Sequence, residues 1–77
     1  MKAKYFRLVY VYDNDELIGV GTQFRIRHQW YSDCLYYKKD SSISITICDK
    51  INYYIFNDYQ ATYTIYVDSE KDFWRCE

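Results

Sequence analysis

The chain has 77 residues, a formal net charge of −1 and an aromatic share of 22%, with 11 tyrosines and no proline. This length predicts one domain spanning residues 1–77, and a hydrophobic share of 49% excludes a disordered chain. The charge gives no overall attraction to nucleic acid or an anionic membrane, and no apolar run approaches the roughly 20 residues of a membrane helix. The wealth of Tyr and Ile favours strands.

The first predicted element is a strand over Lys4–Tyr12, which reads as a strand rather than as a signal peptide. The motif "DNDE" then predicts a turn, because Asp and Asn bond to nearby backbone groups. A second strand is predicted over Leu17–Trp30, where apolar and polar side chains alternate. The even length of the turn pairs Tyr12 with Leu17, Tyr10 with Gly19 and Leu8 with Gly21.

Both glycines of the chain, Gly19 and Gly21, fall in this second strand. They have no side chains, so large neighbours can lie over the backbone and a long strand can coil strongly. A glycine bulge at this point is the alternative.

The segment Tyr31–Asp40 is compatible with a short helix capped by Ser32 or with an irregular crossing, and both interpretations stay open. Residues 40–68 predict a three-strand antiparallel meander with turns at Asp49-Lys50 and Asn57-Asp58. One face of this meander collects the apolar side chains Ile43, Ile45, Ile47, Tyr54, Phe56, Tyr59, Ala61, Tyr63, Ile65 and Val67. Ile45, Tyr54 and Tyr63 are therefore expected to be adjacent and mostly buried.

The C-terminal segment predicts a short helix with Ser69 as its N-cap, anchored on the sheet by Phe73 and Trp74. The predicted fold is mainly β. It is a small bent antiparallel sheet or open barrel of about five strands, made of a hairpin and the meander, with one or two short helical segments.

Neither a metal site nor a catalytic site is predicted. Zinc ligands usually come in close pairs, whereas Cys34, Cys48 and Cys76 are irregularly spaced, and His28 shares the parity of the core face. The odd cysteine count without an export signal favours free thiols in the cytoplasm. We find no glycine-rich elbow and no paired carboxylates outside the turns, so we expect no enzyme activity, no cofactor and no metal.

Two groups of side chains are predicted to bind a partner. The first is a stripe on the outer face of the meander, formed by Ile51, Tyr53 and Ile55. The second combines aromatic anchors with a charged rim, as interface hot spots do. It consists of Trp30, Tyr31, Tyr36 and Tyr37 beside Arg25 and Arg27.

The aromatic surface favours a non-catalytic protein-binding module, because 17 aromatic rings cannot all be buried in a chain of 77 residues. By analogy of size and chemistry, we expect a phage or mobile-element inhibitor of a host defence complex, such as an anti-CRISPR or other anti-defence protein. Its partner would be a larger host protein or ribonucleoprotein complex in the cytoplasm. The alternative is a small β-barrel that binds nucleic acid by aromatic stacking and Arg or Lys contacts. A homodimer is also left open.

Overall fold

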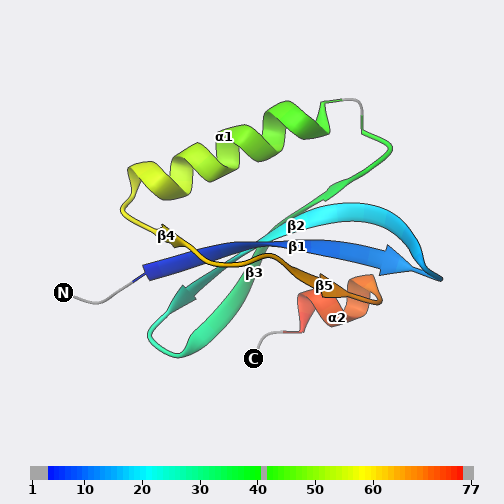
Figure 1. Ribbon diagram of the computed structural model, residues 1–77, viewed down its shortest axis with the longest axis horizontal. Coiled ribbons are helices and arrows are strands. Elements are labelled where there is room, and N and C mark those ends of the chain that lie inside the picture. Colours follow the sequence, from blue (N-terminus) through cyan, green and yellow to red (C-terminus); the bar gives the residue numbers. More distant parts are fainter. Residues whose placement is uncertain (1–3, 41, 76–77) are drawn as a thin grey trace.

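Strand β1 (Lys4–Asp13) lies at the centre of a five-stranded sheet in the computed structural model, which describes residues 4–40 and 42–75 (Figure 1). The antiparallel strands β2 (Glu16–Ile26) and β3 (Gln29–Tyr37) follow on one side of β1. The order from β3 to β4 is β3-β2-β1-β4.

Two short strands line the other edge of β1, and two helices cover the faces of the sheet. β4 (Gln60–Ala61) and β5 (Ile65–Val67) both run parallel to β1. Helix α1 (Ile43–Phe56) lies over one face, and helix α2 (Glu70–Trp74) lies against the opposite face (Figure 1). The predicted fold class is confirmed, since the described residues are mainly β, with 49% strand and 27% helix, and form a mixed sheet that does not close. No helix among the described residues is long and apolar enough to cross a membrane.

The first hairpin turns at Asn14 and Asp15, whose φ angles are 51° and 65°. Positive φ at both central residues matches the twist of the paired strands, and Asn and Asp tolerate it better than other side chains do. Tyr12 lies opposite Leu17, as predicted. Beyond this pair Ile18 is an extra residue, so the predicted register is wrong by one residue. The bulge is centred on Ile18 and is not the glycine bulge of the alternative, because Gly19 and Gly21 pair with Val11 and Val9.

A second hairpin turns at Arg27 and His28, inside the segment predicted as one continuous strand. Arg27 has a φ of 65°, a value that favours glycine over a long side chain. The residue types at this position therefore do not indicate a turn. The segment Tyr31–Asp40, left open between a helix and an irregular crossing, mostly belongs to strand β3.

Residues 43–56 form helix α1, so the predicted meander is wrong. The predicted turn at Asp49-Lys50 lies in the middle of this helix. The segment alternates like a strand and is rich in β-branched residues, yet Ile43, Ile47 and Tyr54 also recur at helical spacing. Short apolar segments of this kind fit both the period of two residues of a strand and the period of about 3.6 residues of a helix. Packing against the sheet then decides which of the two structures forms.

The core predicted for the meander is also wrong. Tyr54 is 1% exposed, whereas Ile45 and Tyr63 are 69% and 82% exposed. Tyr54 stacks on Phe6 of β1 with ring centres 4.8 Å apart, which places α1 over the face of the sheet that carries Phe6.

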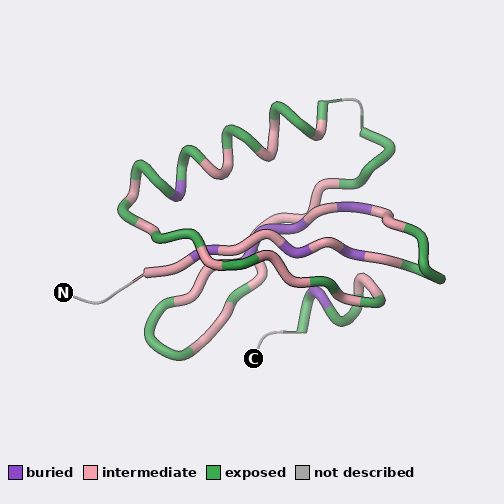
Figure 2. The backbone as a smooth tube through the Cα atoms, in the orientation of Figure 1, coloured by how far each residue is buried: buried purple, intermediate pink, exposed green. Residues whose placement is uncertain are grey.

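Helix α2 begins as predicted at Ser69, whose hydroxyl accepts a hydrogen bond from the backbone N–H of Asp72 at 3.1 Å. Its Phe73 is fully buried against Val9 and Val11 of β1. Buried residues are concentrated in β1 and β2, with one in each helix (Figure 2). A helix of five residues is marginal in isolation, so the burial of Phe73 holds it in place.

The glycines of β2 leave room for neighbouring atoms, as the sequence predicts. The ring of Phe73 occupies the space that a Cβ atom on Gly21 would need. A Cβ atom on Gly19 would lie 2.6 Å from the backbone oxygen of Tyr36. The large neighbours are Phe73 and β3, rather than the predicted Tyr10 and Leu8.

Candidate functional site

Basic side chains gather at the end of the molecule formed by the β2–β3 turn. Arg25, Arg27 and His28 fall in residues 22–31, which contain no acidic residue. The Nε atom of Arg25 donates a hydrogen bond to the backbone oxygen of Arg27 at 3.0 Å. The first residues of β1 add two more cations, because Lys4 pairs with Ile26 and Arg7 pairs with Gln23 on the neighbouring strand β2.

Aromatic rings and guanidinium groups alternate on the face of the sheet that α2 covers. Tyr5, Arg25 and Trp30 are direct neighbours on three adjacent strands. The guanidinium carbon of Arg25 lies 5.7 Å from the centre of the Tyr5 ring, and that of Arg7 lies 3.9 Å from the Trp30 ring. Arg7 also donates from Nε to the side-chain oxygen of Gln23 at 2.9 Å. These cation–π and hydrogen-bond contacts hold the side chains in defined positions.

The opposite face at this end is aromatic as well. Phe24 and Tyr31 stack with ring centres 5.4 Å apart, and the Nζ atom of Lys4 lies 4.8 Å from the centre of the Tyr59 ring. A surface hollow is lined by Phe24, Ile26, Arg27 and Tyr31. We call the following set the basic-aromatic end: Lys4, Tyr5, Arg7, Arg25, Arg27, His28, Trp30 and Tyr31.

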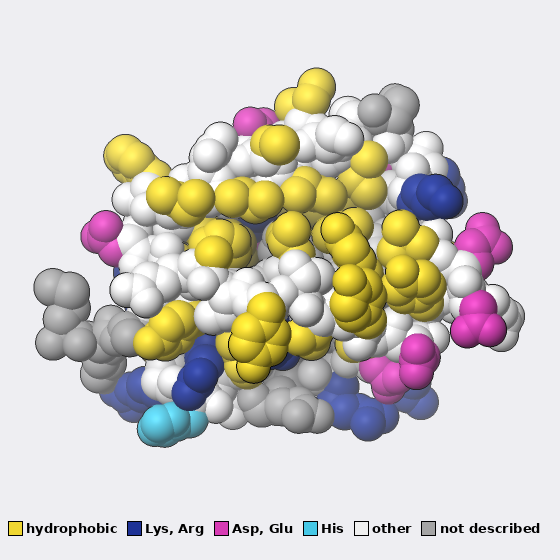
Figure 3. Space-filling view, viewed as in Figure 1, with side chains coloured by type: hydrophobic (Ala, Val, Ile, Leu, Met, Phe, Trp, Pro, Cys, Tyr) yellow, Lys and Arg dark blue, Asp and Glu magenta, His cyan; other side chains and the backbone are white. Residues whose placement is uncertain are grey.

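The two ends of the sheet carry opposite charge. The β1–β2 turn holds Asp13, Asp15 and Glu16, while the β2–β3 turn holds Arg25, Arg27 and His28. In Figure 3 the histidine lies near Lys and Arg side chains at lower left, whereas Asp and Glu side chains gather at right, where further Lys and Arg side chains also lie. The basic β2–β3 turn and the acidic β1–β2 turn thus lie at opposite ends of the sheet, although Lys38 and Lys39 also lie beside Glu16 at the latter end.

The second predicted binding group is divided by the structure. Trp30 and Tyr31 lie near the start of β3, and Tyr36 and Tyr37 lie at its end. At 3.3 Å per residue, the two pairs are about 20 Å apart. Burial, and then the neighbouring Cys34 thiol, raises the pKa of Tyr36 to about 12. A hydrogen bond with Glu70 raises the pKa of Tyr37. The two pairs therefore lie at opposite ends of β3 rather than in one cluster.

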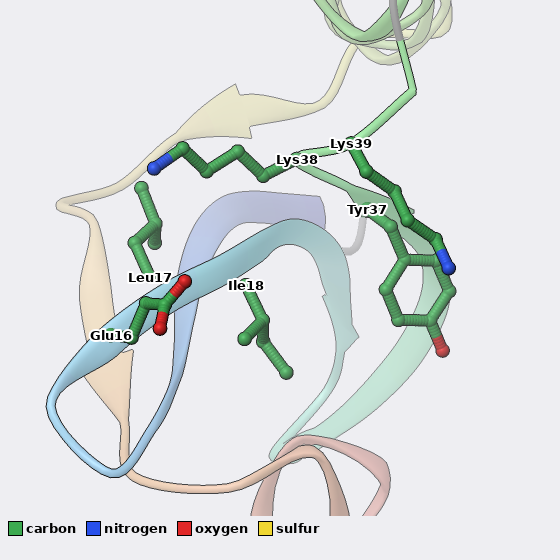
Figure 4. A pocket seen from close by; sticks show the side chains of 6 residues that line it. All are labelled: Glu16, Leu17, Ile18, Tyr37, Lys38 and Lys39. Carbon is green, nitrogen blue, oxygen red and sulfur yellow. The ribbon is translucent and has the colours of Figure 1, made fainter.

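A second hollow, which the sequence did not predict, lies beside Tyr37 at the far end of β3. Its lining residues are Glu16, Leu17, Ile18, Tyr37, Lys38 and Lys39. Figure 4 shows the Lys39 side chain alongside Tyr37. The Lys38 side chain extends toward Leu17, whereas the Ile18 side chain points away from Lys38. One carboxylate and two ammonium groups at its rim give this hollow no dominant charge.

The first predicted binding group lies on helix α1 rather than on a strand. Tyr53 and Ile55 are exposed on the outer side of α1, whereas Ile51 is half-buried toward the sheet. Phe56 and Ile45, which the sequence placed in the core, join the exposed group instead. Hydrophobic side chains form a row along α1 in Figure 3.

A polar cluster that the sequence did not predict connects α1 with β3. Asp33 is an extra residue in β3, since Cys34 pairs with Thr22 and Ser32 pairs with Gln23. Its carboxylate accepts a hydrogen bond from the hydroxyl of Tyr54 at 2.5 Å and lies 2.8 Å from the Nζ atom of Lys50. The bulge thus turns a carboxylate toward the helix. The sequence shows an acid in an otherwise uncharged strand, but not the direction in which its side chain points.

The pKa values in this cluster follow from its geometry. Partial burial acts to raise the pKa of Asp33, but Lys50 and Tyr54 outweigh this effect and leave that pKa below its ordinary value. Burial and the hydrogen bond to Asp33 raise the pKa of Tyr54. Burial acts to lower the pKa of Lys50, and the contact with Asp33 reverses this, so the pKa of Lys50 is raised. All three groups therefore keep their interacting forms over a wide pH range.

The thiols and the histidine are dispersed. His28 is exposed in a turn, which corrects its predicted place at the edge of the core. Cys34 is half-buried in β3 and Cys48 is exposed on α1, both as free thiols, while Cys76 lies outside the described residues. Among residues 4–40 and 42–75, no three His, Cys, Asp or Glu side chains gather as ligands for a metal ion would.

None of these surfaces can be interpreted through relatives. No protein-family model, curated protein or solved structure matches this chain in comparisons of sequence and structure.

Proposed function

We propose that this protein is a non-catalytic protein-binding module that uses its basic-aromatic end to cover a surface of a larger protein or ribonucleoprotein complex. The observation that carries this proposal is the ordered row of Tyr5, Arg25 and Trp30, with Arg7 stacked 3.9 Å over Trp30. Trp, Tyr and Arg are the residue types that contribute most to binding at protein interfaces. Their mutual contacts reduce the entropy that a partner would have to remove on binding.

The charge at this end indicates the chemistry of the partner. Arg27 and His28 are exposed at the tip of the turn, with Arg25 half-buried beside them. A partner surface with acidic groups around an apolar centre would complement both the cations and the exposed ring of Tyr31. Such complementarity acts mainly on the association rate.

The narrower proposal is that this protein is encoded by a phage or mobile element. It would inhibit a defence complex of the host cell by stoichiometric blocking. The proposal is supported by analogy with small inhibitors of this kind, whose task needs an interaction surface and no chemistry. Inhibition should then saturate at a fixed molar ratio of this protein to its target, with no turnover. Permanent modification of the target by a catalytic amount of protein would contradict this proposal.

Nucleic acid is the second candidate partner, and the segregation of charge favours it more than the net charge does. The basic-aromatic end offers rings for stacking beside cations for phosphates, the combination that binds single strands. The exposed ring of Tyr31 and the neighbouring Arg27 line the same hollow. The two candidates differ in how binding responds to salt.

The experiment reverses charge at two places. Arg25→Glu with Arg27→Glu changes the basic-aromatic end, and Lys38→Glu with Lys39→Glu makes the same change of charge at the other end of β3. The partner is recovered from source cells with the unmodified protein as bait, identified by mass spectrometry, and its binding kinetics are measured with each variant. We expect the arginine variant to bind at least 10-fold more slowly and the lysine variant to bind normally.

A salt titration separates the candidates. If single-stranded nucleic acid is the partner, the arginine variant should flatten the slope of log affinity against log salt by roughly 1.4, that is about 0.7 for each lost phosphate contact. If a protein is the partner, purified nucleic acid should not bind at physiological salt. Equal loss of binding in both charge variants would contradict the assignment of the site.

A further inference from the structure

The outer side of α1 is a second surface, separate from the basic-aromatic end. Its exposed residues are Ser44, Ile45, Cys48, Asp49, Asn52, Tyr53, Ile55 and Phe56. Ile45 is 69% exposed and Phe56 is 88% exposed. A solvated helix face normally carries several charged side chains, whereas this one has the single charge of Asp49. The composition of this side indicates burial against another apolar surface.

The spacing of four of these residues matches a helix–helix contact. Ile45, Cys48, Asn52 and Ile55 follow one another at intervals of three, four and three residues. This spacing lines up one narrow stripe on a helix and is the repeat by which two helices pack along their length. We call these four residues the α1 seam.

The α1 seam is complementary to itself. Its intervals read the same in both directions. Two antiparallel copies would therefore place Ile45 opposite Ile55 and Cys48 opposite Asn52, and each pair would occur twice, once on each side of the two-fold axis. Such an isologous contact closes at two subunits and does not continue into a filament. The polar amide of Asn52 would favour one register over slipped ones.

The charges of the two ends favour the antiparallel arrangement. Helix α1 runs along the sheet, with Phe56 toward the end where β1 begins and Ile43 toward the opposite end (Figure 1). A two-fold axis across α1 would bring the acidic β1–β2 turn of one copy to the same side as the basic-aromatic end of the other. A parallel pair would place like charges together.

We propose that the α1 seam is the interface of an antiparallel homodimer, with a second copy of this chain as its occupant. A helix of 14 residues is about 21 Å long, so the contact is smaller than a standard interface of about 1,600 Å². The dimer therefore forms reversibly and depends on protein concentration. The basic-aromatic ends stay free at opposite ends of the pair.

Sedimentation equilibrium over a wide concentration range tests the dimer. We expect the unmodified protein to move from monomer to dimer, and Ile55→Glu to stay monomeric with an unchanged circular dichroism spectrum. Tyr53→Glu is the matched control, because Tyr53 is exposed on the same helix but lies outside the seam. A protein that is monomeric at all concentrations, or a dimer that survives Ile55→Glu, would overturn the proposal.

Disulfide trapping tests the direction of the helices and keeps the proposal testable if Ile55→Glu fails to fold. One chain retains Cys48, and the other carries Cys48→Ser with Asn52→Cys; both carry Cys34→Ser and Cys76→Ser. Antiparallel packing should cross-link the mixture at least 10-fold faster than either chain alone, whereas equal rates would contradict it. The test is independent of the proposed function, since Arg25→Glu with Arg27→Glu should leave the dimer intact.

Discussion

Gly21 sets how closely helix α2 approaches the sheet. The buried ring of Phe73 lies directly over its backbone, in the space where any other residue would place a Cβ atom. The same ring contacts Val9 and Val11, so it cannot move away without opening the core. A single absent methyl group thus determines the packing of the C-terminal segment.

Gly21→Ala should therefore destabilise the protein by about 1–3 kcal/mol, the usual cost of overpacking a core. The measurement is the free energy of unfolding in urea. A matched control combines Gly21→Ala with Phe73→Leu, which shortens the obstructing side chain. We expect the pair to be less destabilised than the sum of the single variants, because the clash is shared between them. Additive losses would show that the ring and the glycine do not compete for the same space.

At the scale of elements, the sequence predicts the parts whose signals are local. Strand β1, its turn at Asn14-Asp15 and the cap of α2 at Ser69 were all predicted, because each depends on neighbouring residues. Helix α1 was not, since its apolar residues fit both periods and Tyr54 selects the helix by stacking on Phe6.

The candidate site was predictable in residue type but not in grouping. The sequence singles out Arg25, Arg27 and Trp30, which do lie together. It also joins them to Tyr36 and Tyr37, because nothing in the sequence indicates the turn at Arg27, where a long side chain takes a positive φ. Without that turn, the direction of β3 and the distance between its two aromatic pairs are unknown.

The cluster of Asp33, Lys50 and Tyr54 joins two elements, and it predicts how stability depends on pH. The depressed pKa of Asp33 means that its contribution is present above the ordinary value of 3.8 and is lost as the pH falls through its lower value in the folded protein. The raised pKa values of Lys50 and Tyr54 mean that their contributions are lost only in alkali, above the ordinary values of 10.5 and 10.0.

Asp33→Asn should lower the free energy of unfolding by about 1–3 kcal/mol at neutral pH, because it leaves Lys50 without its carboxylate. The difference from the unmodified protein should shrink as the pH drops below about 4. Urea unfolding at a series of pH values measures both. Asp49→Asn, on the exposed side of α1, serves as the control and should give a much smaller change. A difference that is constant from pH 2 to 7 would contradict the role of the Asp33 carboxylate.

At the scale of the whole molecule, the first and last described elements share one core. Val9 and Val11 of β1 enclose Phe73 of α2, and Ile65 and Val67 of β5 pack around them. Strand β1 pairs with β2 on one side and with β4 and β5 on the other, so each half of the chain needs the other to complete the sheet. Folding is therefore expected to be cooperative, with no stable half.

Phe73→Ala should remove most of the stability of the fold. The loss of a buried Phe costs about 3–5 kcal/mol, against a total of about 5–15 kcal/mol for a domain and less for a small one. The adjacent Trp74, which is 46% exposed, provides a matched control. We expect Phe73→Ala to lose the dispersed amide signals of a folded protein in nuclear magnetic resonance spectra, and Trp74→Ala to retain them. Equal effects would indicate that α2 is not anchored by Phe73.

The central position of β1 has a consequence for synthesis on the ribosome. At about 5–20 residues per second, roughly 3–13 s pass between the translation of Val9 and that of Phe73. During this interval β1 can pair with β2. Its other edge stays unpaired, and the apolar surface that Phe73 will cover stays exposed. The nascent chain thus presents an open strand edge for seconds, the interval in which such an edge is most exposed to pairing with another chain.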